Sequence, residues 1–151
     1  MKIKKLYLQN FKGIYEKKII HFDSHVSLLT GPNGFGKTTI FDVLELCLTG
    51  KIYRTSQKSD VTKHQKDYAK PFYQNTLGQD VLVKVWLSKC EDGNEENLVI
   101  TRHLPKDHDG RTGGSGRRNK PTDFDLLNMY SENIENFDKE EFDKSKANPI
   151  D

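Results

Sequence analysis

The residues best suited to chemistry in this sequence lie at positions 31–39, which read Gly-Pro-Asn-Gly-Phe-Gly-Lys-Thr-Thr. They match the pattern G-x-x-x-x-G-K-[ST] completely. In this pattern the backbone N–H groups of a glycine-rich loop surround phosphate, and a lysine and a hydroxyl complete the cradle. The spacing therefore predicts a loop that binds a nucleoside triphosphate. A glycine turn with a chance lysine is the alternative, and the flanking strand-like and helix-like runs argue against it.

Each position of the loop has its own expected role. Gly31, Gly34 and Gly36 allow the tight turns that bring successive N–H groups together. We expect Lys37 to place its ammonium on the β and γ phosphates, and Thr38 to offer its hydroxyl to Mg2+. Thr39, the next hydroxyl, is expected to reach the α phosphate. The partial positive charge at the start of the following helix adds to the attraction.

Such a loop requires a strand before it and a helix after it. Residues 26–30 predict the strand, apolar enough to be central, through Val26, Leu28 and Leu29. A mostly buried helix is predicted over residues 38–48, with Gly50 as its stop signal. Asp42 and Glu45 mark the side of this helix that we expect to face solvent.

Two hairpins are predicted around this unit. An N-terminal hairpin over residues 3–22 turns at Gly13, and a second one pairs residues 80–87 with 98–104 through a Glu-Asp-Gly-Asn turn. Trp86 falls on the face opposite the alternating valines, where packing suits it better than base stacking. The predicted fold class is α/β, with a mixed sheet around the phosphate-loop helix and an additional antiparallel β hairpin.

Composition limits the other classes. The chain has 151 residues and a net charge of +2, but residues 1–120 carry 21 Lys and Arg against 13 Asp and Glu, whereas residues 121–151 carry 3 against 9. A basic body suits nucleic acid, and equally a solvated surface. The two cysteines, Cys47 and Cys90, have no metal or disulfide spacing, and no run approaches 18 apolar residues. We expect a soluble, cytoplasmic protein without a membrane partner.

Three polar segments lie outside the predicted elements. Residues 51–70 are expected to form a loop. Residues 105–121 predict a flexible, basic loop rich in Gly and Arg, whose Thr-Gly-Gly-Ser-Gly core equally fits an expression linker. Residues 122–151 predict an acidic, partly helical tail, because apolar side chains recur there at helical intervals. Residues 1–104 would then form the nucleotide-binding lobe.

Three stretches together resemble the N-terminal lobe of SMC and RecF type ATPases, which are ABC-class enzymes. They are Ile-Lys-Lys-Leu-Tyr-Leu-Gln-Asn-Phe-Lys-Gly-Ile from residue 3, the phosphate-loop stretch over residues 26–44, and Val-Ile-Thr-Arg at residues 99–102. The resemblance is specific to about residue 50, moderate to Leu104 and absent beyond. Asp42 matches a common acidic helix position in the family, and Arg102 matches an arginine to which no catalytic role is assigned.

The resemblance implies ATP and Mg2+ as ligands and a specific set of binding residues. Lys12, in the Asn-Phe-Lys element, would approach the phosphates or the base. Thr38 would be the metal ligand. Phe35 stands where the family usually has a small residue, and binding should survive because its side chain should project away from the phosphates. The implied phosphate cradle consists of Asn33, Gly34, Phe35, Gly36, Lys37, Thr38 and Thr39.

Hydrolysis in this class needs parts that do not follow Thr38 in this sequence. They are an apolar strand ending in Asp-Glu, a glutamine loop, and a Ser-Gly signature from a partner lobe. Residues 19–23 imitate the first of these, but they precede the loop and lack the Glu. We therefore expect no catalytic residue in this chain. The economical interpretation is the front portion of a longer ATPase, cut before the glutamine loop, which binds nucleotide weakly and turns it over poorly or not at all.

The resemblance also implies partners and a process. ATP would hold two heads together as a homodimer, each head completed by the C-terminal lobe of the same ATPase. The assembly would act on DNA in repair, chromosome maintenance or phage defence. A self-contained, non-hydrolysing nucleotide- or DNA-binding module that ends near Asp151 is the alternative. A small GTPase or nucleotide kinase fits less well, because the sequence has no Asn-Lys-x-Asp motif and no arginine-rich lid.

Overall fold

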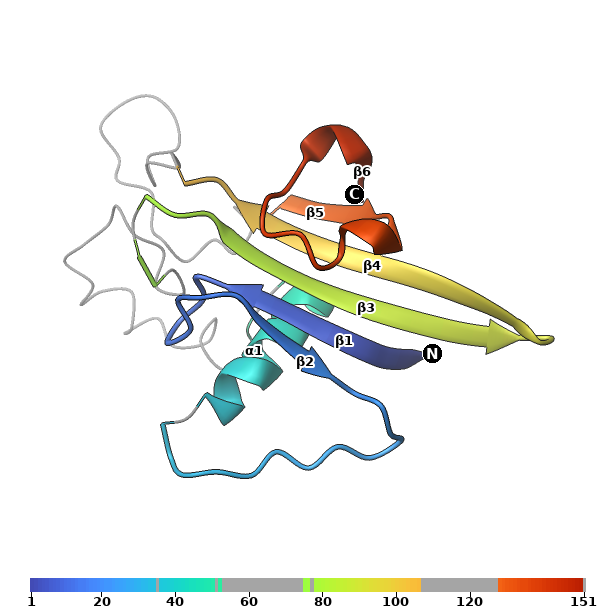
Figure 1. The fold of residues 1–151 in the computed structure, drawn as a ribbon, viewed down its shortest axis with the longest axis horizontal. Coiled ribbons are helices and arrows are strands. Elements are labelled where there is room, and N and C mark those ends of the chain that lie inside the picture. The colour runs from blue at the N-terminus through green and yellow to red at the C-terminus, as the bar shows by residue number, and fades with distance from the viewer. Residues whose placement is uncertain (35, 51, 53–74, 77, 107–127, 151) are drawn as a thin grey trace.

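A single sheet organises the computed structural model, which describes residues 1–34, 36–50, 52, 75–76, 78–106 and 128–150. Its strand order is β2-β1-β3-β4-β5-β6, and each neighbouring pair is antiparallel (Figure 1). The strands are β1 Lys2–Gln9, β2 Lys18–His21, β3 Val81–Glu91, β4 Asn94–Leu104, β5 Asn128–Glu132 and β6 Ala147–Pro149. Helix α1 is Lys37–Thr49, and two 3-10 turns are η2 Ile134–Asn136 and η3 Lys144–Lys146. The predicted α/β class is confirmed.

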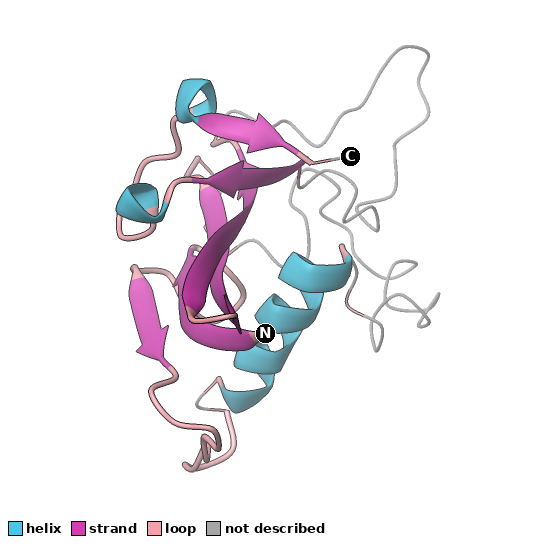
Figure 2. Cartoon of the chain, turned by 90° about the vertical axis from the view of Figure 1, so that its right-hand side faces the viewer, coloured by secondary structure: helices cyan, strands magenta, loops and turns pink. Residues whose placement is uncertain are grey.

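The two faces of the sheet carry separate cores, because alternate side chains of a strand point to opposite faces. On one face Leu6, Leu8 and Val85 pack with Val43 and Leu46 of α1. On the other face a smaller cluster consists of Tyr7, Leu82, Val99 and Phe137. Figure 2 shows α1 against one face and the two 3-10 turns beyond the other. No helix in the described ranges is long and apolar enough to cross a membrane.

Both predicted hairpins and the predicted helix are confirmed. Strands β1 and β2 pair through Leu6 and Ile20, while β3 and β4 pair along their whole length. At the tip of the second hairpin Asp92 and Gly93 have φ angles of 50° and 80°, which is the Asp-Gly turn that favours tight hairpins. Gly50 ends α1 in a left-handed conformation, donating its N–H to the Leu46 carbonyl.

The predicted strand at residues 26–30 is wrong. These residues form no strand, and the side chains of Val26 and Leu28 are in solvent, with 83% and 84% of each residue exposed. A strand needs a neighbour for its N–H and C=O groups, and no described strand pairs with this segment. The segment instead runs as an extended connection from β2 to the start of α1 (Figure 1).

The predicted faces of α1 also need correction. Asp42, expected on the solvent side, is buried, whereas Phe41 and Leu48 are exposed. The sheet covers one side of the helix only, so a 3.6-residue repeat places Asp42, Val43 and Leu46 inward and Phe41 outward. The apolar side chains on its outer side explain why the sequence predicted a mostly buried helix.

Residues 128–150, the described part of the predicted acidic and partly helical tail, form two strands and two 3-10 turns. Strand β5 pairs with β4, with Tyr130 opposite Thr101, and β6 pairs with β5. A single turn of 3-10 helix places Phe137 against Tyr7, with ring centroids 6.2 Å apart. A three-residue spacing of apolar side chains suits one such turn as well as a longer helix, which is why the pattern misled.

Two predicted loops cannot be compared with the structure. Most of the predicted loop at residues 51–70 lies outside the described residues, and so does the basic loop at 105–121 from residue 107 onward.

Candidate functional site

The glycine-rich loop leads directly into α1, as the motif requires. Gly34 and Gly36 have φ angles of 90° and 85°, in a region that side chains with a Cβ enter at a cost. Gly36 is the N-cap of α1 and carries no side chain to satisfy the N–H groups of the first turn. Those groups are therefore available to an anion. Asn33 is exposed in the turn, and Phe35 lies outside the described residues.

The Lys37 ammonium lies over this loop. Its Nζ donates hydrogen bonds to the carbonyl oxygen of Gly31 and, at 2.8 Å, to that of Pro32. The ammonium of the first residue of α1 therefore contacts the residues at the start of the loop. Thr38 is exposed and Thr39 is buried. Of the two hydroxyl side chains, Thr38 is therefore the more accessible to a metal ion.

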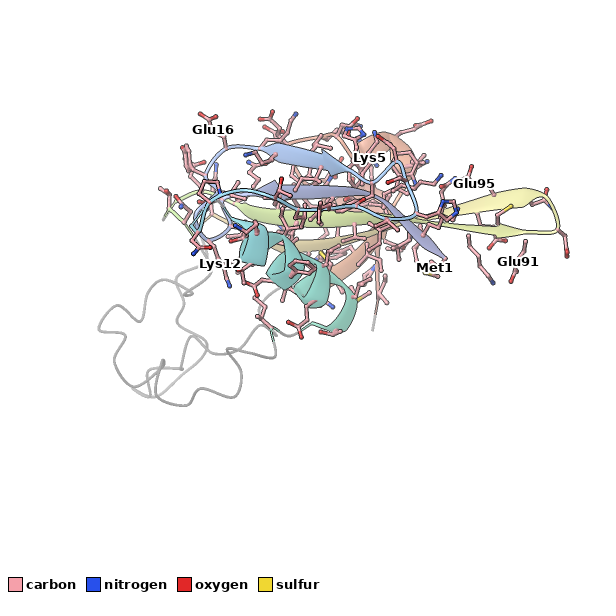
Figure 3. All side chains as sticks on the ribbon, turned by 90° about the horizontal axis from the view of Figure 1, so that it is seen from below. Met1, Lys5, Lys12, Glu16, Glu91 and Glu95 are labelled. Carbon is pink, nitrogen blue, oxygen red and sulfur yellow. The ribbon has the colours of Figure 1, made fainter. Side chains whose placement is uncertain are left out.

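The turn after β1 packs against the same helix. The Lys12 Nζ lies 2.5 Å from an Asp42 carboxylate oxygen. Ile14, in the same turn, lies close to Gly36: a Cβ atom added to Gly36 would be 3.9 Å from the Ile14 Cδ1 atom. Figure 3 shows Lys12 beside the N-terminal part of α1. The structure therefore brings the Asn-Phe-Lys turn and the phosphate loop together, although they are distant in sequence.

Asn10 holds that turn in place, a role that the sequence analysis missed. Its amide nitrogen donates to the carbonyls of Thr76 and Gln79, at 3.0 Å each, and its amide oxygen accepts from the Thr76 N–H at 2.8 Å. Asn10 and Lys12 both have positive φ angles, of 54° and 49°. Such backbone costs about 1–2 kcal/mol per residue, less for Asn, and persists where neighbours fix it. The preference of Asn for this conformation was the available signal.

Arg102 fastens the other end of α1 to the sheet. Its Nε and Nη2 atoms each lie 3.3 Å from the Cys47 carbonyl oxygen, in the last turn of the helix. A cation is favourable there because the helix C-terminus is partially negative. Burial lowers the pKa of Arg102 and raises that of the Cys47 thiol to about 12. We therefore assign Arg102 a structural role at the end of α1.

The arrangement is suited to holding a phosphate chain. It combines left-handed glycines, helix N–H groups without a side-chain cap, the ammonium of Lys37 and the exposed hydroxyl of Thr38. These groups fit ATP with Mg2+, which needs one hydroxyl ligand from such a loop alongside phosphate oxygens and water. Asp42 is buried and paired with Lys12, so its carboxylate is poorly placed to activate water.

Comparison with known proteins adds a family match. A model described as an AAA domain matches residues 5–148. The DNA replication and repair protein RecF of Clostridium acetobutylicum is 42% identical over 100 residues, which cover 66% of this chain and 27% of that protein. RecF of Protochlamydia amoebophila is 35% identical over 65 residues, covering 43% of this chain and 18% of that protein. The chromosome partition protein Smc of Halobacteriovorax marinus is 46% identical over 44 residues, covering 29% of this chain and 4% of that protein.

These relatives are much longer than this chain, which spans about a quarter of the first one and less of the others. A solved structure from a study of ATP-driven dimerization and DNA-stimulated activation of SMC ATPases superimposes with a TM-score of 0.49 at 24% identity. The superposition covers 83% of this chain and 76% of that one. The family match continues past Leu104, where the recognisable resemblance ended, and includes strand β5 and the start of β6.

Proposed function

Because the chain belongs to the AAA domain family, as the N-terminal lobe of an SMC and RecF type ATPase, we propose that it binds ATP with Mg2+ at the start of α1. The observation that carries the proposal is the position of the Lys37 ammonium over a loop whose glycines are left-handed. Since the loop opens a helix, its N–H groups and its ammonium converge on one anionic ligand.

Each residue of the loop would have one task. Lys37 would exchange the carbonyls of Gly31 and Pro32 for oxygens of the β and γ phosphates. Thr38 would give its hydroxyl to Mg2+, which neutralises phosphate charge when bound. Thr39 would lie nearest the α phosphate. Backbone N–H groups would come from Asn33, Gly34, Phe35 and Gly36. Lys12 would approach the phosphates or the base from the neighbouring turn.

We further propose that the remainder of the ATPase covers exposed apolar side chains on the two segments that flank the phosphate loop. They are Val26 and Leu28, on the segment entering the loop, and Phe41 and Leu48, which lie seven residues apart on the outer side of α1. Large apolar side chains in solvent favour a partner that covers them. A C-terminal lobe in contact with these segments would border the nucleotide and bring the groups for hydrolysis, and a second head would close the site from outside.

The cellular process is proposed from the relatives. RecF is named for DNA replication and repair, and Smc for chromosome partition. We propose that the whole protein acts on DNA in repair, chromosome maintenance or phage defence, and that it works in the cytoplasm. The basic charge of residues 1–120 supports contact with DNA phosphates.

Isothermal titration calorimetry with ATP and Mg2+ tests the proposal. We expect the wild-type chain to bind and Lys37→Ala to lose binding, because the substitution removes the cation from the loop. Thr38→Ala should retain weaker binding that no longer depends on Mg2+. Lys89→Ala is the matched control, at a lysine near the tip of the β3–β4 hairpin whose side chain is 44% exposed. Unchanged ATP affinity in Lys37→Ala would show that the triphosphate does not bind at the phosphate loop.

A further inference from the structure

Lys12 and Asp42 form an ion pair that is almost withdrawn from solvent. Their side chains are 16% and 2% exposed, and the ammonium lies 2.5 Å from the carboxylate. Charges are seldom buried without a partner because losing water is costly for each of them. This pair therefore fixes both side chains in one geometry, and it joins the turn after β1 to the helix that follows the phosphate loop.

Asp42 lies in α1 one turn after the phosphate loop, so the ion pair is close to the proposed triphosphate site. Asp42 follows Thr38 by four residues and Thr39 by three, so it lies on the same side of the helix, one turn further on. A carboxylate without a cation, one helical turn from the phosphate loop, would repel a triphosphate bound at the start of α1. Paired with Lys12, it contributes no net charge and instead holds an ammonium near the phosphate loop.

The backbone of Lys12 is held independently of this contact. The Asn75 side chain donates to the Lys12 carbonyl, and Asn10 binds Thr76 and Gln79. Ile14, on the far side of the turn, adjoins Gly36. Loss of the Asp42 carboxylate would therefore leave the turn in place and remove the charge partner of the Lys12 ammonium.

We propose that Asp42 is a positioning residue for nucleotide binding, which holds the Lys12 ammonium against α1 so that this ammonium donates a hydrogen bond to the triphosphate. The inference rests on the proposed function of the loop. It identifies a residue that does not itself touch nucleotide and acts through Lys12.

A double-mutant cycle on ATP affinity tests this. Calorimetry with ATP and Mg2+ would compare wild type, Asp42→Asn, Lys12→Met and the double variant, with thermal unfolding measured in parallel. Each single variant should bind ATP about tenfold more weakly than wild type. This factor is the lower end of the loss in affinity that follows removal of an orienting partner at metal sites. The double variant should bind no more weakly than Lys12→Met, because Asp42 acts only through Lys12. Asp42→Glu, which keeps the charge, should recover most of the affinity.

The outcomes separate this inference from the proposed function. If Lys37→Ala abolishes binding while Asp42→Asn binds as well as wild type or more tightly, the positioning role is wrong and the phosphate loop stands. Additive losses in the double variant would show that Asp42 acts without Lys12, and would also overturn the inference. If Asp42→Asn does not fold, Lys12→Met still tests the inference. Unchanged ATP affinity in Lys12→Met would show that Lys12 does not contribute to binding, and the positioning role of Asp42 would then be wrong.

Discussion

Removing one half of the buried pair Lys84–Glu132 should destabilise the fold strongly. The pair lies on the sheet face opposite α1, with Nζ and Oε2 3.2 Å apart and side chains 0% and 2% exposed. Lys84 also donates to the Asn136 carbonyl at 2.7 Å, and the Thr101 hydroxyl donates to the Glu132 carboxylate. Burial lowers the pKa of Lys84, while the neighbouring carboxylate opposes that shift.

The expected magnitude follows from what each substitution leaves behind. Lys84→Met leaves the Glu132 carboxylate buried without its cation. Glu132→Gln leaves the Lys84 ammonium buried without its anion. Loss of one partner of a buried pair costs about 3–5 kcal/mol. A change of 1 kcal/mol shifts Tm by roughly 2–4 °C at this chain length, so we expect a fall of roughly 6–20 °C. The double variant Lys84→Met/Glu132→Leu should regain most of this, because apolar side chains of similar volume need no partner.

Circular dichroism during thermal and urea unfolding measures these differences. The matched control is Lys4→Met, which breaks the exposed pair Lys4–Glu95 at 3.3 Å and should cost less than about 1 kcal/mol. Single variants within about 1 kcal/mol of wild type would refute the reasoning, as would a double variant that loses the sum of both single effects.

Two further predictions concern the thiols and the turn after β1. Cys90 is exposed and Cys47 is buried with a pKa raised to about 12, so a disulfide reagent at pH 8 should label Cys90 alone until denaturant is added. Rapid labelling of both thiols in the native protein would contradict this. Asn10→Ala should lower the free energy of unfolding by about 1–3 kcal/mol in urea, because partners at Thr76 and Gln79 lose their hydrogen bonds. A loss below about 0.5 kcal/mol would show that the amide does not hold the turn.

Local patterns were enough to predict the elements that flank the site. The hairpin turn at Asp92-Gly93 and the stop at Gly50 follow from the conformations these residues prefer, and both are present. The phosphate loop was recognisable because its glycines and lysine have fixed spacing. Each of these features depends on residues close together in the chain, which is why the sequence was sufficient.

The remaining features depend on contacts between distant residues. Asp42 is charged and was expected in solvent, yet its partner Lys12 precedes it by 30 residues and permits its burial. The segment at 26–30 is apolar enough for a central strand, but a strand forms only beside another. Strand β5 is polar in pattern and owes its pairing to β4. None of these partners is indicated by the local sequence.

The most direct test of the central claim is an NMR titration of the 15N-labelled chain with ATP and Mg2+. We predict that the amide signals of Gly34, Gly36, Lys37 and Thr38 shift most, because their N–H groups would surround the phosphates. The amide signals of the β3–β4 hairpin tip next to Glu91, at the far end of the sheet from Lys12, should remain unchanged (Figure 3). The largest shifts elsewhere, with the loop signals unmoved at saturating nucleotide, would contradict the claim that this loop holds the triphosphate.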